Sequence, residues 1–144
     1  MDIQDCIKFA NEHRVCSFAT AEGDQPRVRI LAMWFADDTG FYFHSQSVKA
    51  LCKQLKNNPK AEVAFYAPDE KPMGRVMRVA GEIEFLYDME LLKKSYEARP
   101  FLKDMGVKGP EDPLMAVFRI PHGKAHFWAM GSSMYEDDIE IIKF

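Results

Sequence analysis

Two arginines on one face of an expected strand are the first residues of this chain that could do chemistry. Arg27 and Arg29 stand two residues apart in the run QPRVRILAM. Because side chains alternate along a strand, both guanidinium groups face the same side. That face is either an anion site or an ordinary solvated surface, and the arginines alone do not decide between the two.

A second polar cluster follows the aromatic run FYF. It consists of His44, Ser45, Gln46 and Ser47, and Lys49 comes two residues later at the start of an amphipathic stretch. The free backbone amides of a first helical turn would point to the same place, with Ser47 as the expected N-cap. These amides, the hydroxyls, Lys49 and a strand arginine together could hold a phosphate dianion in water.

The elements that must position these clusters are mostly strands. Alternating apolar residues and turn signals predict them in VCSFATAE, QPRVRILAMWF, FYFHS, AEVAFYA, RVMRVAGEIEFL, LMAVFRIP and KAHFWAM, with a short edge strand in the tail IEIIKF. Helical spacing marks residues 2–13, SVKALCKQLKNN and, after Asp88 as a cap, MELLKKSYEA. Six or seven strands with short connections favour a mainly β fold with flanking helices, an antiparallel barrel that is closed or partly open. A parallel sheet would need a helix after most strands.

Composition and charge narrow the class of protein. With 144 residues the chain is expected to form a single domain, 1–144. A formal net charge of -3 argues against a general nucleic-acid binder. The absence of an 18-residue apolar run and the acidic, amphipathic N-terminus predict a cytoplasmic protein without a membrane span. The cysteines and histidines lack the spacing of metal ligands, so no metal is expected.

Four stretches together resemble the pyridoxamine 5'-phosphate oxidase-like FMN-binding split barrels, especially the short general-stress-protein and nitroimidazole-resistance-like members. They are QPRVRILAM, TGFYFHSQSVKALCKQLKNNPKAEVAFY, RVAGEIEF and the aromatic strand that ends in FW. The second is the most specific, because it joins an aromatic strand, a hydroxyl, a lysine at a helix start and an Asn-Pro helix end. The resemblance spans residues 16–130 and implies a Greek-key-like antiparallel split barrel.

The resemblance also implies a cofactor site. Arg29 and Lys49 would grip the phosphate of flavin mononucleotide (FMN), and Arg27 is a weaker candidate for the same role. Around the phosphate, ribityl chain or ring, the pocket would be lined by His44, Ser45 and Gln46.

A homodimer with the flavin in a cleft between subunits is implied as well. Trp128, from the C-terminal strands, would lie near the isoalloxazine ring, although a buried core tryptophan is an equally good reading.

Departures from the family pattern bear on the substrate. Trp34 stands where true pyridoxamine phosphate oxidases carry a lysine, and Met134, Glu136 and Asp138 stand where they carry an arginine-x-histidine-x-arginine run. Arg99 matches a substrate-phosphate arginine of those enzymes, but alone it is more often a helix-end charge. The vitamin B6 reaction is therefore not expected.

The resulting hypothesis is an FMN-dependent oxidoreductase that passes electrons from a reduced nicotinamide to a small acceptor of the nitro or quinone type. The flavin would carry the redox chemistry, so no protein acid or base is assigned. One alternative is a non-catalytic flavin module for stress response or electron transfer. Another is a split barrel that uses haem or a deazaflavin. The acceptor and the choice between NADH and NADPH stay open.

Overall fold

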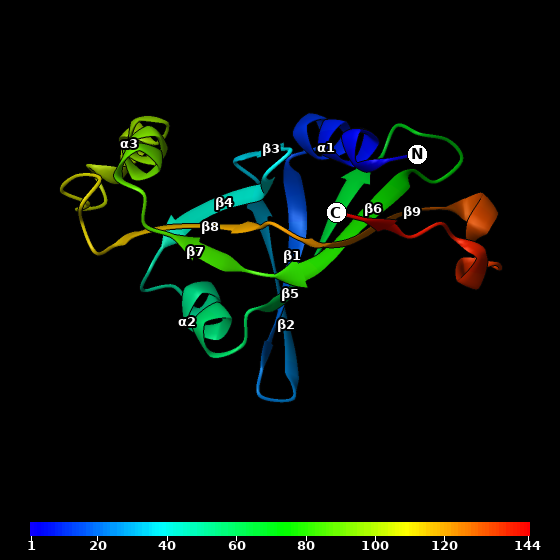
Figure 1. Cartoon of the computed structure of the whole chain (residues 1–144), viewed down its shortest axis with the longest axis horizontal. Coiled ribbons are helices and arrows are strands. Elements are labelled where there is room, and N and C mark those ends of the chain that lie inside the picture. The colour runs from blue at the N-terminus through cyan, green and yellow to red at the C-terminus, as the bar shows by residue number, and fades with distance from the viewer.

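The protein is described by a computed structural model that covers residues 1–144, and its strands form two antiparallel sheets (Figure 1). The six-stranded sheet has the order β10-β9-β6-β5-β1-β2. Its members are β1 (Val15–Glu22), β2 (Gln25–Ala32), β5 (Lys60–Ala67), β6 (Arg75–Glu82), β9 (Gly123–Ala129) and β10 (Ile142–Lys143). The four-stranded sheet has the order β3-β4-β8-β7. Its members are β3 (Phe35–Asp37), β4 (Gly40–Gln46), β7 (Glu84–Leu86) and β8 (Met115–Ile120).

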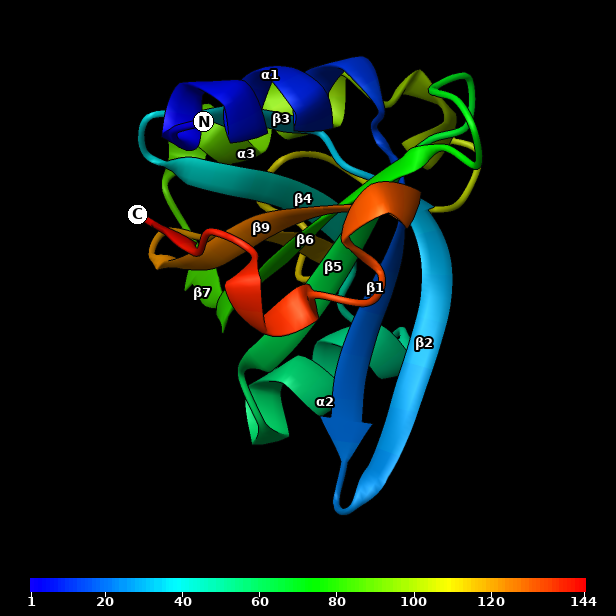
Figure 2. The same ribbon diagram turned by 90° about the vertical axis from the view of Figure 1, so that its right-hand side faces the viewer.

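The predicted strands VCSFATAE and QPRVRILAMWF form a hairpin of β1 and β2, with Glu22 opposite Gln25 across a turn at Gly23. It extends as a long twisted pair beyond the rest of the sheet, and its inner face lies beside helix α2 (Ala50–Asn57) (Figure 2). On β1 the residues Cys16, Phe18 and Thr20 are buried, whereas their neighbours are less so. The alternation shows that one face of the hairpin packs on the core and the other is left open.

The structure has ten strands rather than the six or seven predicted. The number is higher because a stretch predicted as one strand can be divided between the two sheets. RVMRVAGEIEFL was predicted to be a single strand, but it divides at Ile83 into β6 and β7, which belong to different sheets. The chain also passes from one sheet to the other between β8 and β9, next to the point where β6 ends. There Gly81 pairs with Gly123, and a Cβ on Gly123 would lie 2.1 Å from the Ala80 carbonyl oxygen. The two backbones approach too closely for any side chain at this position.

Phenylalanines fill the space between the sheets. Phe18, Phe43, Phe65 and Phe118 are fully buried, and the rings of Phe18 and Phe43 meet edge to face with centroids 5.0 Å apart. Because these side chains come from β1, β4, β5 and β8, they join the two sheets through one apolar core.

Three helices flank the sheets (Figure 1). Helix α1 (Ile3–Glu12), predicted over residues 2–13, begins with a capping box at Asp2 and buries Cys6, Phe9 and Ala10. Helix α3 (Met89–Glu97) is capped by Asp88, as expected, and packs near β8 over a smaller apolar cluster. Short 3-10 turns follow at Pro100–Leu102, Met130–Ser132 and Glu136–Asp138. None of the helices is long and apolar enough to cross a membrane.

The start of α2 differs from the prediction. Ser47 is not its N-cap, because its hydroxyl donates instead to the carbonyl oxygen of Pro113 at 2.7 Å. The helix begins at Ala50, with Lys49 as an N-cap that makes no side-chain capping bond. The first free amides of α2 therefore have no side-chain cap and stay available to a ligand.

Candidate functional site

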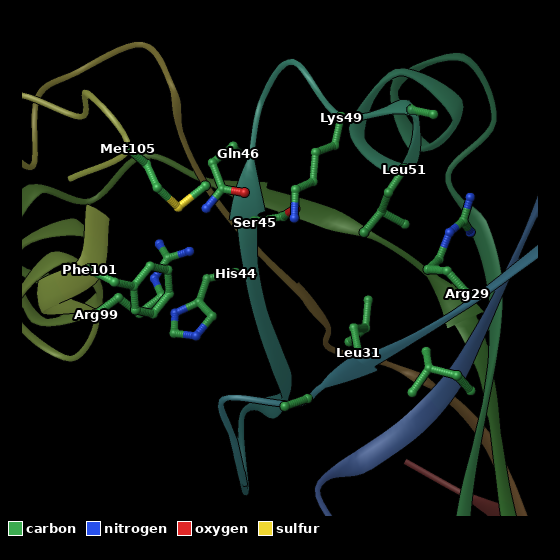
Figure 3. A pocket seen from close by; sticks show the side chains of 13 residues that line it. Arg29, Leu31, His44, Ser45, Gln46, Lys49, Leu51, Arg99, Phe101 and Met105 are labelled. Atoms are coloured by element: carbon green, nitrogen blue, oxygen red, sulfur yellow. The ribbon is translucent and has the colours of Figure 1, made fainter. Parts of the chain in front are cut away.

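A cavity of about 520 Å³ lies between β2, the end of β4, the start of α2 and the segment that follows α3 (Figure 3). Three of the side chains that line it are basic and none is acidic. The lining consists of Arg29, Ile30, Leu31, Ala32, His44, Ser45, Gln46, Lys49, Ala50, Leu51, Arg99, Phe101 and Met105. Cations without carboxylates, beside an apolar wall, suit a ligand that has an anionic group and a flat apolar body.

Arg29 is held by neutral oxygen atoms. Its Nη1 donates to Thr20 Oγ1 at 2.8 Å and to the Phe18 carbonyl at 3.2 Å, and its Nη2 donates to Gln54 Oε1. Partial burial lowers the pKa of Arg29, and the side chain forms no ion pair. The guanidinium therefore carries an uncompensated charge at the cavity.

Lys49 is exposed at the N-cap of α2 and also forms no ion pair within the chain. In Figure 3 its side chain extends from the helix start toward Ser45. The part of the cavity lined by Arg29 and Lys49 is called the Arg29 end below. Both side chains line the cavity, and in Figure 3 the side chain of Leu51 lies between the Arg29 guanidinium and the Lys49 amino group. With the uncapped amides of α2 they supply the charged and backbone donors predicted for a phosphate.

The end of β4 supplies three polar side chains to the cavity wall. Ser45 and Gln46 are only 7% and 8% exposed. Gln46 Oε1 is buried and accepts no hydrogen bond, which is rare for a buried polar atom. An acceptor of this kind, beside a cavity, suits a donor group on a ligand.

A second arginine lies at the opposite end. Arg99 is 6% exposed, and it donates from Nη2 to Ser95 Oγ at 2.8 Å and from Nε to the Ser95 carbonyl at 3.3 Å. It forms no ion pair, and burial lowers its pKa to about 10. Arg99 thus lies at the end of α3, as a helix-end charge would, but it is buried and lines the cavity. Arg99, Ser95 and His44 are called the Arg99 end below.

His44 completes the Arg99 end. Its Nδ1 lies 3.0 Å from Ser95 Oγ, and its ring stacks on Trp34 with centroids 4.9 Å apart. Burial, and then the charge of Arg99, lower the pKa of His44 to about 3, so the ring is neutral near pH 7. Because Ser95 Oγ accepts from Arg99, its own proton is free to go to Nδ1. This favours the tautomer that carries its proton on Nε2.

Two of the predicted site residues, Arg27 and Trp128, do not line the cavity. Arg27 is exposed and pairs with Glu22 at 3.1 Å rather than lining the cavity. Trp128, on β9, donates from Nε1 to Glu136 Oε1 at 2.6 Å and is also absent from the lining. The cavity brings together the other five, which are Arg29, His44, Ser45, Gln46 and Lys49.

The apolar wall of the cavity was not predicted from the sequence. Phe101 and Met105 reach the cavity from the loop after α3, and Leu51 reaches it from α2. The loop carries no motif, so only the fold brings it to the site. Leu51 is also one of the buried residues of α2, so its type and spacing do not set it apart from a core residue.

Known proteins with similar sequences form one family. Residues 3–129 match the family model described as pyridoxamine 5'-phosphate oxidase. The pyridoxine/pyridoxamine 5'-phosphate oxidase of Pseudomonas putida (strain W619) is 31% identical over 96 residues, which are 66% of this chain and 43% of that protein. The chain thus spans less than half the length of the oxidase that it matches.

Solved structures show the same fold. A NimC/NimA family protein from Clostridium acetobutylicum aligns with a TM-score of 0.77 and 28% identity, over 98% of this chain and 92% of that one. General stress protein 26 from Bacillus anthracis str. Sterne aligns with a TM-score of 0.71 and 18% identity, over 100% of both chains. The antiparallel split barrel predicted from the sequence is confirmed.

Proposed function

The chain belongs to the pyridoxamine 5'-phosphate oxidase family, and from that premise we propose that it binds FMN and works as an oxidoreductase. Family membership supports a flavin-binding split barrel. The choice of FMN rests on the cavity, which is lined by three basic side chains and no acidic one. The positive charges of the cavity have no acidic partner within the chain, and this observation carries the proposal. An anionic ligand would supply the missing negative charge.

The phosphate of FMN fits best at the Arg29 end. Arg29 and Lys49 provide charged donors, and the uncapped start of α2 adds backbone amides. The isoalloxazine ring would then contact the apolar wall at Leu31, Leu51 and Phe101. Gln46 Oε1, which is buried without a partner, would accept a hydrogen bond from the ligand.

When bound, FMN supplies the electron-transfer chemistry, and we propose a reduced nicotinamide as donor and a small nitro or quinone compound as acceptor. The protein's own residues bind the cofactor, orient it and limit its contact with water. Oxidation of pyridoxamine phosphate is not proposed. Trp34, which stacks on His44, occupies the position where the family's oxidases carry a lysine.

A homodimer is part of the proposal. Val28 and Ile30 on β2 are 69% and 68% exposed, and Val15 on β1 is 66% exposed. The antiparallel register puts them on the open face of the hairpin, and Ile30 also lines the cavity. A second copy that covered this apolar face would close the cavity on that side and could bring Trp128 near the ring. Sedimentation tests this, because a stable monomer that keeps tight flavin would contradict a shared cofactor.

The function is tested by reconstitution with FMN followed by anaerobic addition of NADH or NADPH. The proposal predicts a flavin spectrum that bleaches and then recovers when a nitro compound or quinone is added. Bound flavin that neither nicotinamide reduces would favour the electron-carrier module. Copurified haem or deazaflavin, with no affinity for FMN, would refute the cofactor assignment.

A further inference from the structure

We infer that Gln54 is a positioning residue for Arg29, and that its uncharged amide keeps the charge of Arg29 available to the phosphate of the ligand. The inference deepens the proposed function and rests on it. Gln54 does not line the cavity, and it acts only through the arginine.

The contacts of Gln54 form a closed set. It projects from α2 and is only 5% exposed. Its Oε1 accepts from Arg29 Nη2 at 2.5 Å and from Thr20 Oγ1 at 2.6 Å. Its Nε2 donates to Glu22 Oε2 at 3.2 Å. Both ends of the amide are occupied, so the orientation of the amide is fixed and the guanidinium is held with it.

Gln54 also separates Arg29 from a carboxylate. Glu22 pairs with Arg27 at 3.1 Å and reaches Arg29 only through the Gln54 amide. The bonds from Arg27 and Gln54 lower the pKa of Glu22, so this carboxylate is ionised near pH 7. The hairpin and α2 thus hold four side chains in a row, which are Arg27, Glu22, Gln54 and Arg29. The carboxylate of Glu22 contacts Arg27, and the neutral amide of Gln54 contacts Arg29.

The neutrality of the amide matters because an arginine in a partly buried place usually has an acidic partner. A carboxylate at position 54 would accept the same two hydrogen bonds and would also neutralise Arg29. The phosphate would then meet an ion pair instead of a free cation. An amide holds the same geometry without this competition.

The sharpest test exchanges the two side chains in the double variant E22Q/Q54E. It keeps the composition and net charge, and the amide now at position 22 can donate to the carboxylate now at position 54. The two positions therefore stay hydrogen-bonded, and only the place of the negative charge changes. Calorimetry should show FMN binding about 10- to 100-fold weaker than in wild type. Riboflavin, which lacks the phosphate, should bind within about threefold of wild type, and E22Q alone should leave FMN affinity within the same range.

Q54M separates charge from geometry, because it removes the acceptor without adding a carboxylate. It should weaken FMN about 3- to 10-fold, less than the exchange does. Unchanged FMN affinity in E22Q/Q54E, or an equal loss for riboflavin, would overturn the inference, as would a loss in Q54M as large as in the exchange. A wild-type protein that binds no FMN would instead refute the proposed function itself.

Discussion

The two ends of the cavity hold the same kind of group in different ways. Arg29 and Arg99 both lack an acidic partner, and both are held by neutral oxygens. Arg29 is half-buried on an edge strand and has three separate partners. Arg99 is nearly fully buried and depends on Ser95 for its oxygen contacts.

This difference shows that a missing counter-ion does not by itself identify the arginine that binds an anion. Whether an arginine can bind an anion also depends on how exposed its guanidinium is and on which other donors line the same site. Lys49 and the start of α2 line the same cavity as Arg29, so a phosphate that reached both side chains would gain several donors at once. Arg99 has a buried neutral histidine beside it, and its charge adds to the effect of burial in lowering the pKa of that histidine.

The largest expected effect is that of Arg29→Met, which removes one of the two charged donors at the Arg29 end. Loss of up to two charge-assisted bonds should weaken FMN by about 3 kcal/mol or more, measured by calorimetry. Arg27→Met is the matched control on the same strand, since Arg27 lies outside the cavity in this chain, and it should have little effect. Equal losses in both variants would mean that only the general charge of the strand matters.

Lys49→Ala should have the next largest effect. It removes one charged donor and leaves the backbone amides of α2 in place, so FMN affinity should fall by about 1.5 to 3 kcal/mol. Lys53, which is exposed on the same helix but outside the cavity, provides the control in Lys53→Ala. Unchanged affinity in Lys49→Ala would remove this residue from the site.

The Arg99 end predicts a pH dependence of folding. The folded pKa of His44, about 3, lies below its ordinary value of 6.5. Above pH 6.5 the ring is neutral in both states. As pH falls from 6.5 toward 3, the unfolded chain takes up a proton that the folded chain excludes, so stability falls by up to about 1.4 kcal/mol per pH unit.

Urea unfolding at pH 7.5 and 5.5 measures this slope. His44→Asn keeps a polar side chain next to Ser95 but does not titrate, so its stability should change less between the two pH values. The same slope in wild type and variant would show that other groups cause it.

The smallest effect is expected from Arg99→Met. Because no carboxylate loses its partner, the free energy of unfolding should fall by less than about 1 kcal/mol, or even rise, as when buried charges are replaced by apolar residues. Urea unfolding checks this. A loss above about 3 kcal/mol would mean that Arg99 compensates a charge in the fold.

The sequence predicted most strands and helices because their signals are local. The Asp88 cap, the turn at Gly23 and the alternation along β1 all act within a few residues. The change of sheet at Ile83 was missed, because the stretch has strand propensity throughout and only packing tells where it bends. Ser47 was misassigned because its partner, Pro113, is far away in the sequence.

The candidate site shows the same difference between features with local signals and features that depend on contacts between distant residues. Arg29 and Lys49 could be placed together because the resemblance covers one continuous part of the chain, and both line the cavity. The burial of Arg99 and the contribution of Phe101 depend on how the loop after α3 folds against β4. Trp128 lies outside the cavity of a single chain, so its predicted role depends on the proposed dimer.

A crystal structure of the protein soaked with FMN would test the central claim most directly. The phosphorus atom is expected at the Arg29 end, with phosphate oxygens in hydrogen-bonding distance of Arg29 and Lys49. A phosphate bound to Arg99 instead, or FMN bound outside this cavity, would contradict it.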